Sequence, residues 1–212
     1  MRIPEELAEL GKKRMNNHQV EGFVYGSGPK KPQLMLVGEA PGETEIHNGI
    51  PFSGRSGKKL MEFLEGLGLT REDVYITSAV RSRPYKWKEK RDRQGKVEMK
   101  KYNRTPIMAE IIAHAPLLDY EIQHVQASII VTLGNIGLQR LVGKTMKITD
   151  VHGQVLQQPV LQINEENSFE WSENNYRIFP TFHPAAVFYN PKLREIIAND
   201  QQVLKKWLRE NT

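Results

Sequence analysis

The 212-residue sequence contains no cysteine. This absence excludes disulfide bonds, thiolate zinc sites, cysteine-held iron–sulfur clusters and cysteine nucleophiles together. The sequence also lacks any apolar run near the ~20 residues that a membrane-spanning helix needs, and its N-terminal segment has no apolar stretch typical of a secretory signal. We therefore expect a cytoplasmic protein that has no membrane partner.

Positive charge is concentrated in one stretch of the chain. The net charge is +5, yet the segment from Arg81 to Arg104 holds eleven Lys or Arg against three acids, so the rest of the chain is net acidic. Tyr85, Trp87 and Tyr102 lie between these cations. Clustered cations with interleaved aromatic side chains suit phosphate contact and base stacking, although a solvated charged loop has the same composition.

Four apolar, β-branched runs alternate with helical patterns along the chain. Their hydrophobicity is continuous rather than alternating, which is typical of parallel strands buried on both faces. We expect one α/β domain over residues 1–212, a three-layer α/β/α arrangement with a central four-stranded parallel sheet. The strands are expected at Gln33–Val37, Val74–Thr77, Ser128–Leu133 and Arg177–Phe182, and the helices at Gly57–Gly68, Thr105–Val125, Asn135–Leu141 and Pro191–Leu208.

Two polar segments read as insertions into this domain. The basic segment at about 85–103 has little apolar periodicity and is expected to form a loop, an arm or a short solvent-facing helix. The segment at about 157–175 is polar with a few β-forming residues, which indicates a hairpin.

Chemically interesting residues follow the ends of the expected strands, where open parallel sheets form their sites. Gly38, Glu39 and Glu45 follow the first strand, and glycines there let the backbone approach a ligand beside carboxylates. Ser78 ends the second strand, and His183 follows the fourth. The alternatives are a pair of turns with surface acids and a structural histidine. The sequence has no metal-ligand spacing, so neither a metal nor another cofactor is expected.

Taken together, six segments resemble family 4 of the uracil-DNA glycosylase superfamily. They occur in the family's order and span most of the chain from Leu34 to Pro191. They are GEAPGETE (Gly38–Glu45), GIPFSGRSGKKL (Gly49–Leu60), VYITSAVRSRP (Val74–Pro84), NRTP (Asn103–Pro106), SIIVTLGNIGLQRLVG (Ser128–Gly143) and TFHPAAVFYNP (Thr181–Pro191). The resemblance implies removal of uracil from DNA. Because no lysine or N-terminal amine is evidently placed as a nucleophile, we expect a monofunctional hydrolase that leaves an abasic site, and we expect it to be a monomer.

The resemblance also implies roles for individual residues. Glu45 stands where the family holds or activates the attacking water, and His183 where it hydrogen-bonds the uracil carbonyl. Phe52 matches the aromatic residue that stacks on the flipped base, and Val187 or Phe188 would fill the gap left in the duplex. The remaining base-binding candidates are Gly38, Glu39, Ala40 and Ser78, and the DNA-binding candidates are Arg81, Arg83, Lys86, Lys88, Lys90, Arg91, Arg104, Ala185 and Ala186.

The sequence departs from the family pattern in three places. The four cysteines that hold the family's iron–sulfur cluster are missing, with Ser82 and His114 in the places of two of them, so no cluster is expected. The basic insertion lengthens a normally short link, and we expect it to supply DNA grip. Ser78 replaces the usual Asn, whose amide matches the uracil edge. Weak uracil activity, another deaminated base, or a DNA-binding relative with little catalysis are therefore all open. A basic hydrolase for a small nucleoside is also open.

Overall fold

The structure, a computed structural model, describes residues 1–92 and 94–211. Its central sheet has five strands in the order β3–β2–β6–β8–β7, and the first four of these run parallel. The expected parallel sheet is thus confirmed, with one antiparallel edge strand added, because β7 pairs antiparallel with β8 from Phe169 to Ile178. The strands are β2 (Leu34–Gly38), β3 (Val74–Ser78), β6 (Ile129–Leu133), β7 (Leu156–Ile163) and β8 (Phe169–Thr181).

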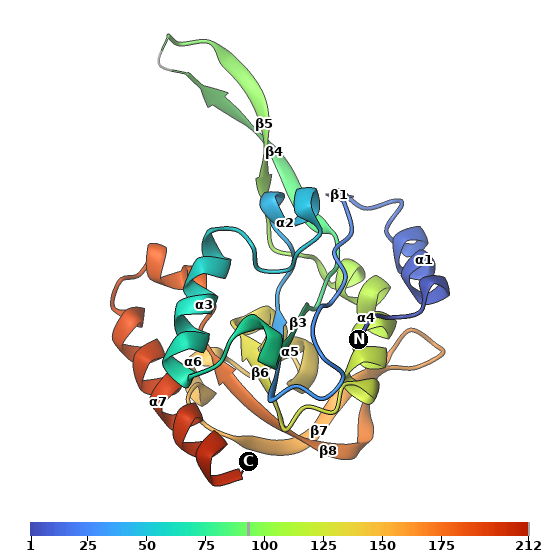
Figure 1. Ribbon diagram of the computed structural model, residues 1–212. Helices are drawn as coiled ribbons and strands as arrows, with labels where there is room; N and C mark the ends of the chain where they lie inside the picture. The colour runs from blue at the N-terminus through green and yellow to red at the C-terminus, as the bar shows by residue number, and fades with distance from the viewer. Residues whose placement is uncertain (93, 212) are drawn as a thin grey trace.

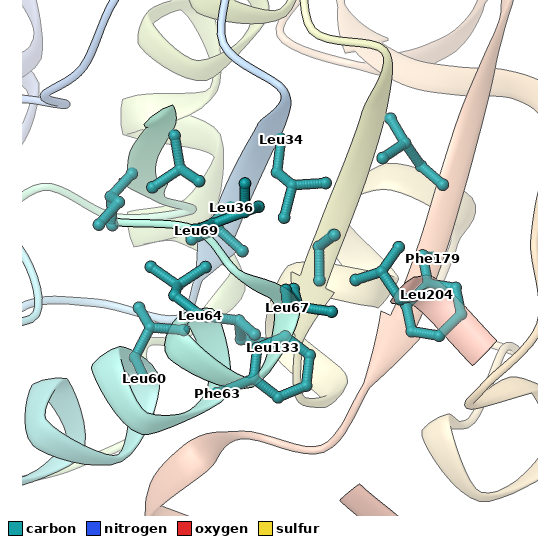
Figure 2. Close-up of a cluster of buried hydrophobic side chains, with 14 of the residues drawn as sticks. Leu34, Leu36, Leu60, Phe63, Leu64, Leu67, Leu69, Leu133, Phe179 and Leu204 are labelled. Atoms are coloured by element: carbon teal, nitrogen blue, oxygen red, sulfur yellow. The ribbon is translucent and has the colours of Figure 1, made fainter. Parts of the chain in front are cut away.

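Helices cover both faces of this sheet, as expected for three layers (Figure 1). Alternate residues of a strand point to opposite faces. Leu34 and Leu36 of β2 pack on one side with α3 (Arg55–Leu67) and α7 (Leu193–Asn211), in the core shown in Figure 2. Met35 and Val37 pack on the other side, where the helices are α4 (Met108–His124), α5 (Asn135–Val142) and α6 (Ile148–Val151). No helix in the described part of the chain is long and apolar enough to cross a bilayer.

Helix boundaries differ from the expected ones at the start of α4. The helix begins at Met108 rather than at Thr105, because the Glu110 carboxylate accepts a hydrogen bond from the Ile107 N–H at 2.9 Å and caps the helix there. Three α-helices were not predicted, namely α1 (Glu5–Arg14), α2 (Glu43–Asn48) and the short α6. Helix α2 lies in the glycine-rich stretch after β2, where two turns were the alternative interpretation.

Both insertions form β-hairpins. In the basic insertion, β4 (Arg83–Arg91) and β5 (Val97–Asn103) pair with each other, and β4 also pairs at its base with β1 (Val20–Glu21). Of the three expected forms it is the arm, and it projects far from the body of the molecule (Figure 1). The polar insertion is the β7–β8 hairpin, as predicted.

Candidate active site

A cleft of about 830 Å³ lies where β2, β3 and β8 end. It is lined by most of the residues proposed to handle the base and by the base of the β4–β5 hairpin. The lining includes Glu39, Ala40, Glu45, Phe52, Ser78 and His183. The topology therefore gathers side chains that lie up to 144 positions apart in the sequence, as the strand-end argument predicts.

Phe52 is held in an unusual backbone conformation beside the cleft. Its φ of 52° lies in the left-handed region, which is rare for a bulky side chain and requires support from the surroundings. Arg71, in the 3₁₀ turn η1 (Arg71–Asp73), supplies that support. Its two terminal nitrogens donate to the carbonyls of Pro51 and Phe52 at 2.8 and 2.7 Å. Gly38 leaves room for the ring, because a Cβ there would lie 2.6 Å from Phe52 Cζ.

Replacing Arg71 with alanine is expected to release the Phe52 loop. Because two carbonyl acceptors lose a charged donor, we expect the kcat/KM of the enzyme to fall about tenfold, which corresponds to ~1.4 kcal/mol. The fall should come mainly from KM, because the ring predicted to stack on the substrate base is misplaced. Steady-state kinetics of R71A beside K58A, which removes an exposed cation from α3, test this. Equal kinetics in the two variants would contradict it.

Glu45 joins the two loops that form one wall of the cleft. The side chain is buried, and its oxygens accept backbone N–H hydrogen bonds from Gly42 at 3.1 Å, Ser53 at 3.1 Å and Gly54 at 2.8 Å. Gly42 and Gly54 immediately precede α2 and α3. The carboxylate is therefore fixed by backbone donors and orients the Gly38–Gly42 loop against the Pro51–Gly54 loop.

Glu39 is the second carboxylate of the cleft, and it is less constrained. Burial raises its pKa, and a side-chain hydrogen bond from Thr105 opposes that shift. A carboxyl with a raised pKa in a cleft is a candidate for proton transfer. The two acids thus differ in environment, Glu45 being held by three backbone donors and Glu39 by a single hydroxyl.

His183 is a neutral imidazole whose tautomer the structure assigns. Burial lowers its pKa to about 4, and the nearby negative charge of Glu45 only partly opposes this. Its Nδ1 accepts the Ala185 backbone N–H at 3.1 Å, at the start of the 3₁₀ turn η2 (Pro184–Phe188). The proton therefore lies on Nε2, which is the donor left for a ligand. The ring also faces Phe52, with centroids 5.8 Å apart.

Ser78 lines the cleft but its hydroxyl is already engaged. The Oγ donates to the Val80 carbonyl at 2.7 Å, so its proton is turned toward the backbone. An acceptor lone pair is what remains for a ligand at this position.

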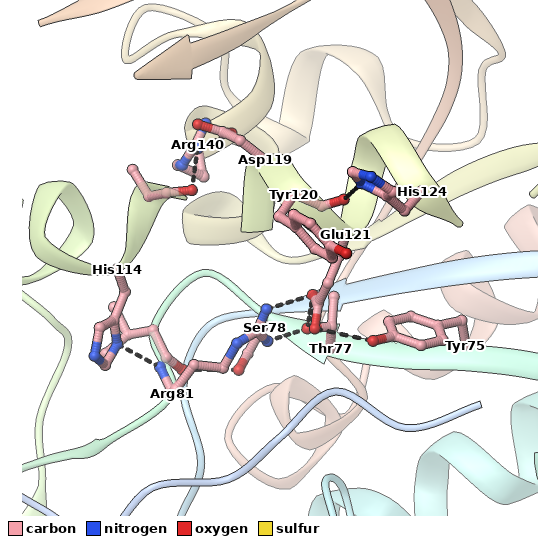
Figure 3. A network of polar contacts seen from close by, with 12 residues as sticks. Tyr75, Thr77, Ser78, Arg81, His114, Asp119, Tyr120, Glu121, His124 and Arg140 are labelled. Atoms are coloured by element: carbon pink, nitrogen blue, oxygen red, sulfur yellow. Dashed lines mark hydrogen bonds and ion pairs between the residues drawn. The ribbon is translucent and has the colours of Figure 1, made fainter. Parts of the chain in front are cut away.

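The structure corrects the role predicted for Arg81. Its side chain is 1% exposed and forms an ion pair with Glu121 of α4, in the buried network of Figure 3. Tyr75 and Thr77 donate to the same carboxylate at 2.9 and 2.6 Å. A DNA contact by Arg81 is therefore wrong, because the guanidinium has no path to a phosphate. Its function is to tie β3 to α4.

Two other arginines from the DNA-binding prediction are also paired with acids. Arg83 donates to Glu21 at 2.7 Å and to the Asn103 side chain at 2.6 Å, and Arg104 binds Glu110 through both terminal nitrogens. These bonds fasten the hairpin base to the body. DNA contact by Arg83 and Arg104 stays a prediction, although these ion pairs already neutralise part of their positive charge.

The predicted DNA-binding residues that remain are the hairpin lysines and the residues of η2. Lys86 lines the cleft, whereas Lys88, Lys90 and Arg91 lie farther out on the arm. The backbone N–H groups of Ala185 and Ala186 are both bound to His183, to its Nδ1 and its carbonyl respectively. Some cleft residues were given no individual role from the sequence, among them Arg55, Lys100, Asn103, Thr105 and Tyr189. Four of these lie within the matched motifs and Lys100 lies in the basic insertion, and that position was their sequence signal.

The donor set does not fit the iron–sulfur cluster that the resemblance implies for its family. The chain has no thiolate to offer. Ser82 is buried, and His114, whose pKa burial lowers to about 3, accepts the Arg81 backbone N–H at 2.8 Å. Among the residues that the structure describes, no group of three or more His, Asp or Glu is placed to hold a metal ion.

Fold and cleft together define a three-layer α/β protein whose cleft places an aromatic ring and a neutral imidazole beside two carboxylates. The family model described as "Uracil DNA glycosylase superfamily" matches residues 25–210. The chain therefore belongs to the uracil DNA glycosylase superfamily.

Several relatives of the chain are named type-4 uracil-DNA glycosylases. The chain is 36% identical to the type-4 uracil-DNA glycosylase of Saccharolobus solfataricus over 87% of its length and 76% of the relative's. It is 34% identical to that of Sulfurisphaera tokodaii, over 97% of the chain and 83% of the relative. Identity to the Thermotoga maritima protein is 33%, over 97% of both chains. The family expected from the motifs is confirmed.

Proposed function

We propose that this protein removes uracil, or another deaminated base, from DNA by hydrolysing its N-glycosidic bond, leaving an abasic site for repair. The observation that carries the proposal is the neutral His183 beside Phe52. An aromatic ring at 5.8 Å and a single imidazole N–H donor suit a flat base bearing a carbonyl oxygen.

The chemistry accounts for the types of residue around the cleft. Breaking the N-glycosidic bond leaves an anionic base and a cationic, oxocarbenium-like sugar. The Nε2–H of His183 stabilises the charge that develops on the base oxygen, and the carboxylate of Glu45 stabilises the sugar and holds the attacking water. Glu39 and Ala40 complete the wall against the base. Water, rather than a lysine, is the nucleophile in this proposal, so the enzyme is monofunctional.

A flipped base leaves a gap in the duplex, and η2 is placed to fill it. Val187 lines a separate cavity of about 170 Å³ beneath the turn, so it is turned away from the cleft. Phe188 and Tyr189 line the cleft itself, and Tyr189 is 89% exposed. We infer that these two aromatic residues, rather than Val187, enter the stack. Arg55 lies over the Phe188 ring at 4.3 Å and holds it.

The substitution Ser78→Asn is expected to raise activity on uracil. An asparagine amide donates and accepts in one plane, so it can match both the carbonyl and the N–H of the uracil edge. We expect kcat/KM on uracil to rise about 5- to 150-fold, equivalent to ~1–3 kcal/mol. S78A is the matched control, and its activity should stay near that of the parent, because the hydroxyl already donates to Val80. A rise in S78A, or none in S78N, would contradict this account of the pocket.

The oligomeric state and the cellular location are part of the same proposal. We propose that the protein acts as a monomer, because one chain supplies the groups that the proposed reaction uses, and that it acts in the cytoplasm.

The experiment is a panel of labelled oligonucleotides with a single uracil, hypoxanthine, xanthine or mismatched thymine, followed by alkali to cut abasic sites. The proposal expects strand cleavage with at least one of these bases, and none with the undamaged strand. Tight binding without cleavage of any substrate would instead identify a DNA-binding relative without catalysis. Activity on free nucleosides alone would support a small-molecule hydrolase.

A further inference from the structure

The β4–β5 hairpin has two unlike faces. Its strands pair from Tyr85–Asn103 to Arg91–Val97, and side chains alternate between the faces along each strand. One face, here called the lysine face, is formed by Lys86, Lys88, Lys90, Glu98, Lys100 and Tyr102. The other, the mixed face, is formed by Tyr85, Trp87, Glu89, Arg91, Val97, Met99, Lys101 and Asn103.

The lysine face is continuous with the cleft. Lys86, Lys100 and Tyr102 all line it. On the mixed face only the base residues Lys101 and Asn103 reach the cleft. The Lys101 ammonium is bound by Glu21 and lies 4.4 Å from the centre of the Tyr85 ring. Free positive charge therefore extends from the cleft along one face of the arm.

The lysine face has uncompensated charge within the described part of the chain. Lys90 approaches Glu98 at 4.0 Å, but Lys86, Lys88 and Lys100 form no hydrogen bond or ion pair there through their side chains. Lys88 stands directly opposite Lys100 in the register. Like charges directly opposite each other destabilise a strand pair. An external anion that lies along this face would remove that repulsion.

The spacing of the lysines fits an extended polyanion. Lys86, Lys88 and Lys90 repeat every ~6.6 Å along β4, and the arm extends ~20 Å from Tyr85 to Arg91, the length of about six base pairs. Ammonium groups are point charges that bind phosphate without reading a base.

We propose that the lysine face binds the sugar-phosphate backbone of DNA on one side of the cleft, several nucleotides from the excised base. The inference rests on the proposed function, because that function places DNA in the cleft. It assigns the DNA contacts of the arm to Lys86, Lys88, Lys90 and Lys100, and it assigns none to Arg91 or the rest of the mixed face.

The test compares two variants that each remove two positive charges from the same hairpin. K88Q/K100Q neutralises the lysine face, and R91Q/K96Q neutralises one residue of the mixed face and one of the connecting turn. Dissociation constants are measured on uncleavable abasic-analogue oligonucleotides whose flanks reach from three to twelve nucleotides on each side, as duplex or as single strand, over a range of salt concentrations.

The parent should bind more tightly as one flank lengthens to about eight nucleotides, with no such gain on the other flank. K88Q/K100Q should lose this dependence on flank length. The magnitude of its slope of log K against log salt concentration should fall by about 2, since each neutralised phosphate contributes ~0.9. R91Q/K96Q should keep the flank dependence and the salt slope of the parent. A gain in affinity with the duplex oligonucleotides would identify a double-stranded flank as the ligand, and a gain with the single-stranded ones an unpaired flank.

Equal losses in the two variants, or a parent whose affinity ignores flank length, would overturn the proposal. Base excision is scored separately, on oligonucleotides too short to reach the arm that carry a single uracil, hypoxanthine, xanthine or mismatched thymine. Excision without flank dependence would reject only the proposed DNA contact of the lysine face. Binding that depends on one flank and on the lysines, without excision of any damaged base, would reject the proposed function but support that DNA contact.

Discussion

Replacing His183 with alanine should lower kcat for base excision by about 100- to 1,000-fold, the range seen when one donor to a developing anion is removed. The Nδ1 atom of His183 is occupied by the Ala185 N–H, so Nε2–H is the donor that the variant loses. Binding of undamaged DNA should change little, because the interaction is made with a flipped base. Single-turnover kinetics give the rate directly.

The pH profile separates a neutral from a charged imidazole. Because burial holds the pKa of His183 near 4, the ring is neutral at every pH above that value, including pH 6 to 8. We therefore expect that His183 contributes no inflection near pH 6.5 to the pH profile of kcat, so that the parent and H183A have profiles of the same shape in this range. H124A, which alters an exposed histidine at the end of α4, should behave as the parent. An inflection near 6.5 that the His183 variant alone abolishes would show that the charged ring is the active form.

Replacing Glu45 with glutamine should lower kcat by about 100-fold, the lower end of the loss expected when a group stabilising transition-state charge is removed. The variant keeps one carbonyl oxygen for the N–H groups of Gly42, Ser53 and Gly54, but it removes the negative charge beside the sugar. E45A should be less active again and less stable, because all three donors then lose their acceptor. Thermal unfolding beside kcat distinguishes the two effects.

Glu39 supplies the matched comparison for this prediction. E39Q removes a carboxylate from the same cleft, and we expect less than a tenfold loss of kcat, because Glu39 is proposed to line the pocket rather than to hold the water. Burial raises the pKa of Glu39, so its protonation on lowering the pH would begin above the usual range of a glutamate. If E39Q is the more damaging variant, and if it also abolishes the acidic limb of the profile, Glu39 and not Glu45 is the essential acid.

The parallel sheet could be predicted because its strands are buried on both faces. Leu34–Gly38 and Ile129–Leu133 are buried throughout and predominantly apolar rather than alternating, and a glycine ends the first and follows the second, so their type and the position of their carboxyl ends follow from pattern alone. The edge strand β7 has no such run, because only one of its eight residues is buried. The helix α2 is short and starts in a glycine-rich turn, where propensity gives little signal.

The site was predictable as a set of positions but not as a set of contacts. A strand end places His183 near Glu39 and Ser78, but the burial of Arg81 depends on Glu121, forty residues away in another element. Arg71 acts on carbonyls twenty and nineteen residues earlier, and Glu45 accepts from backbone N–H groups that no side-chain pattern reveals. The two faces of the hairpin were hidden because the sequence gives no register until β4 and β5 are paired.

The most direct test of base excision measures the free base released in a single turnover, by mass spectrometry, from duplexes that carry one uracil, hypoxanthine, xanthine or mismatched thymine, for the parent and for H183A. We expect the parent to release at least one of these bases in equal amount to an unbroken strand carrying an abasic site, and we expect H183A to lose the rate but to retain DNA affinity. Release that is unchanged in H183A, or binding by the parent without release of any of the four bases, would contradict the proposed function.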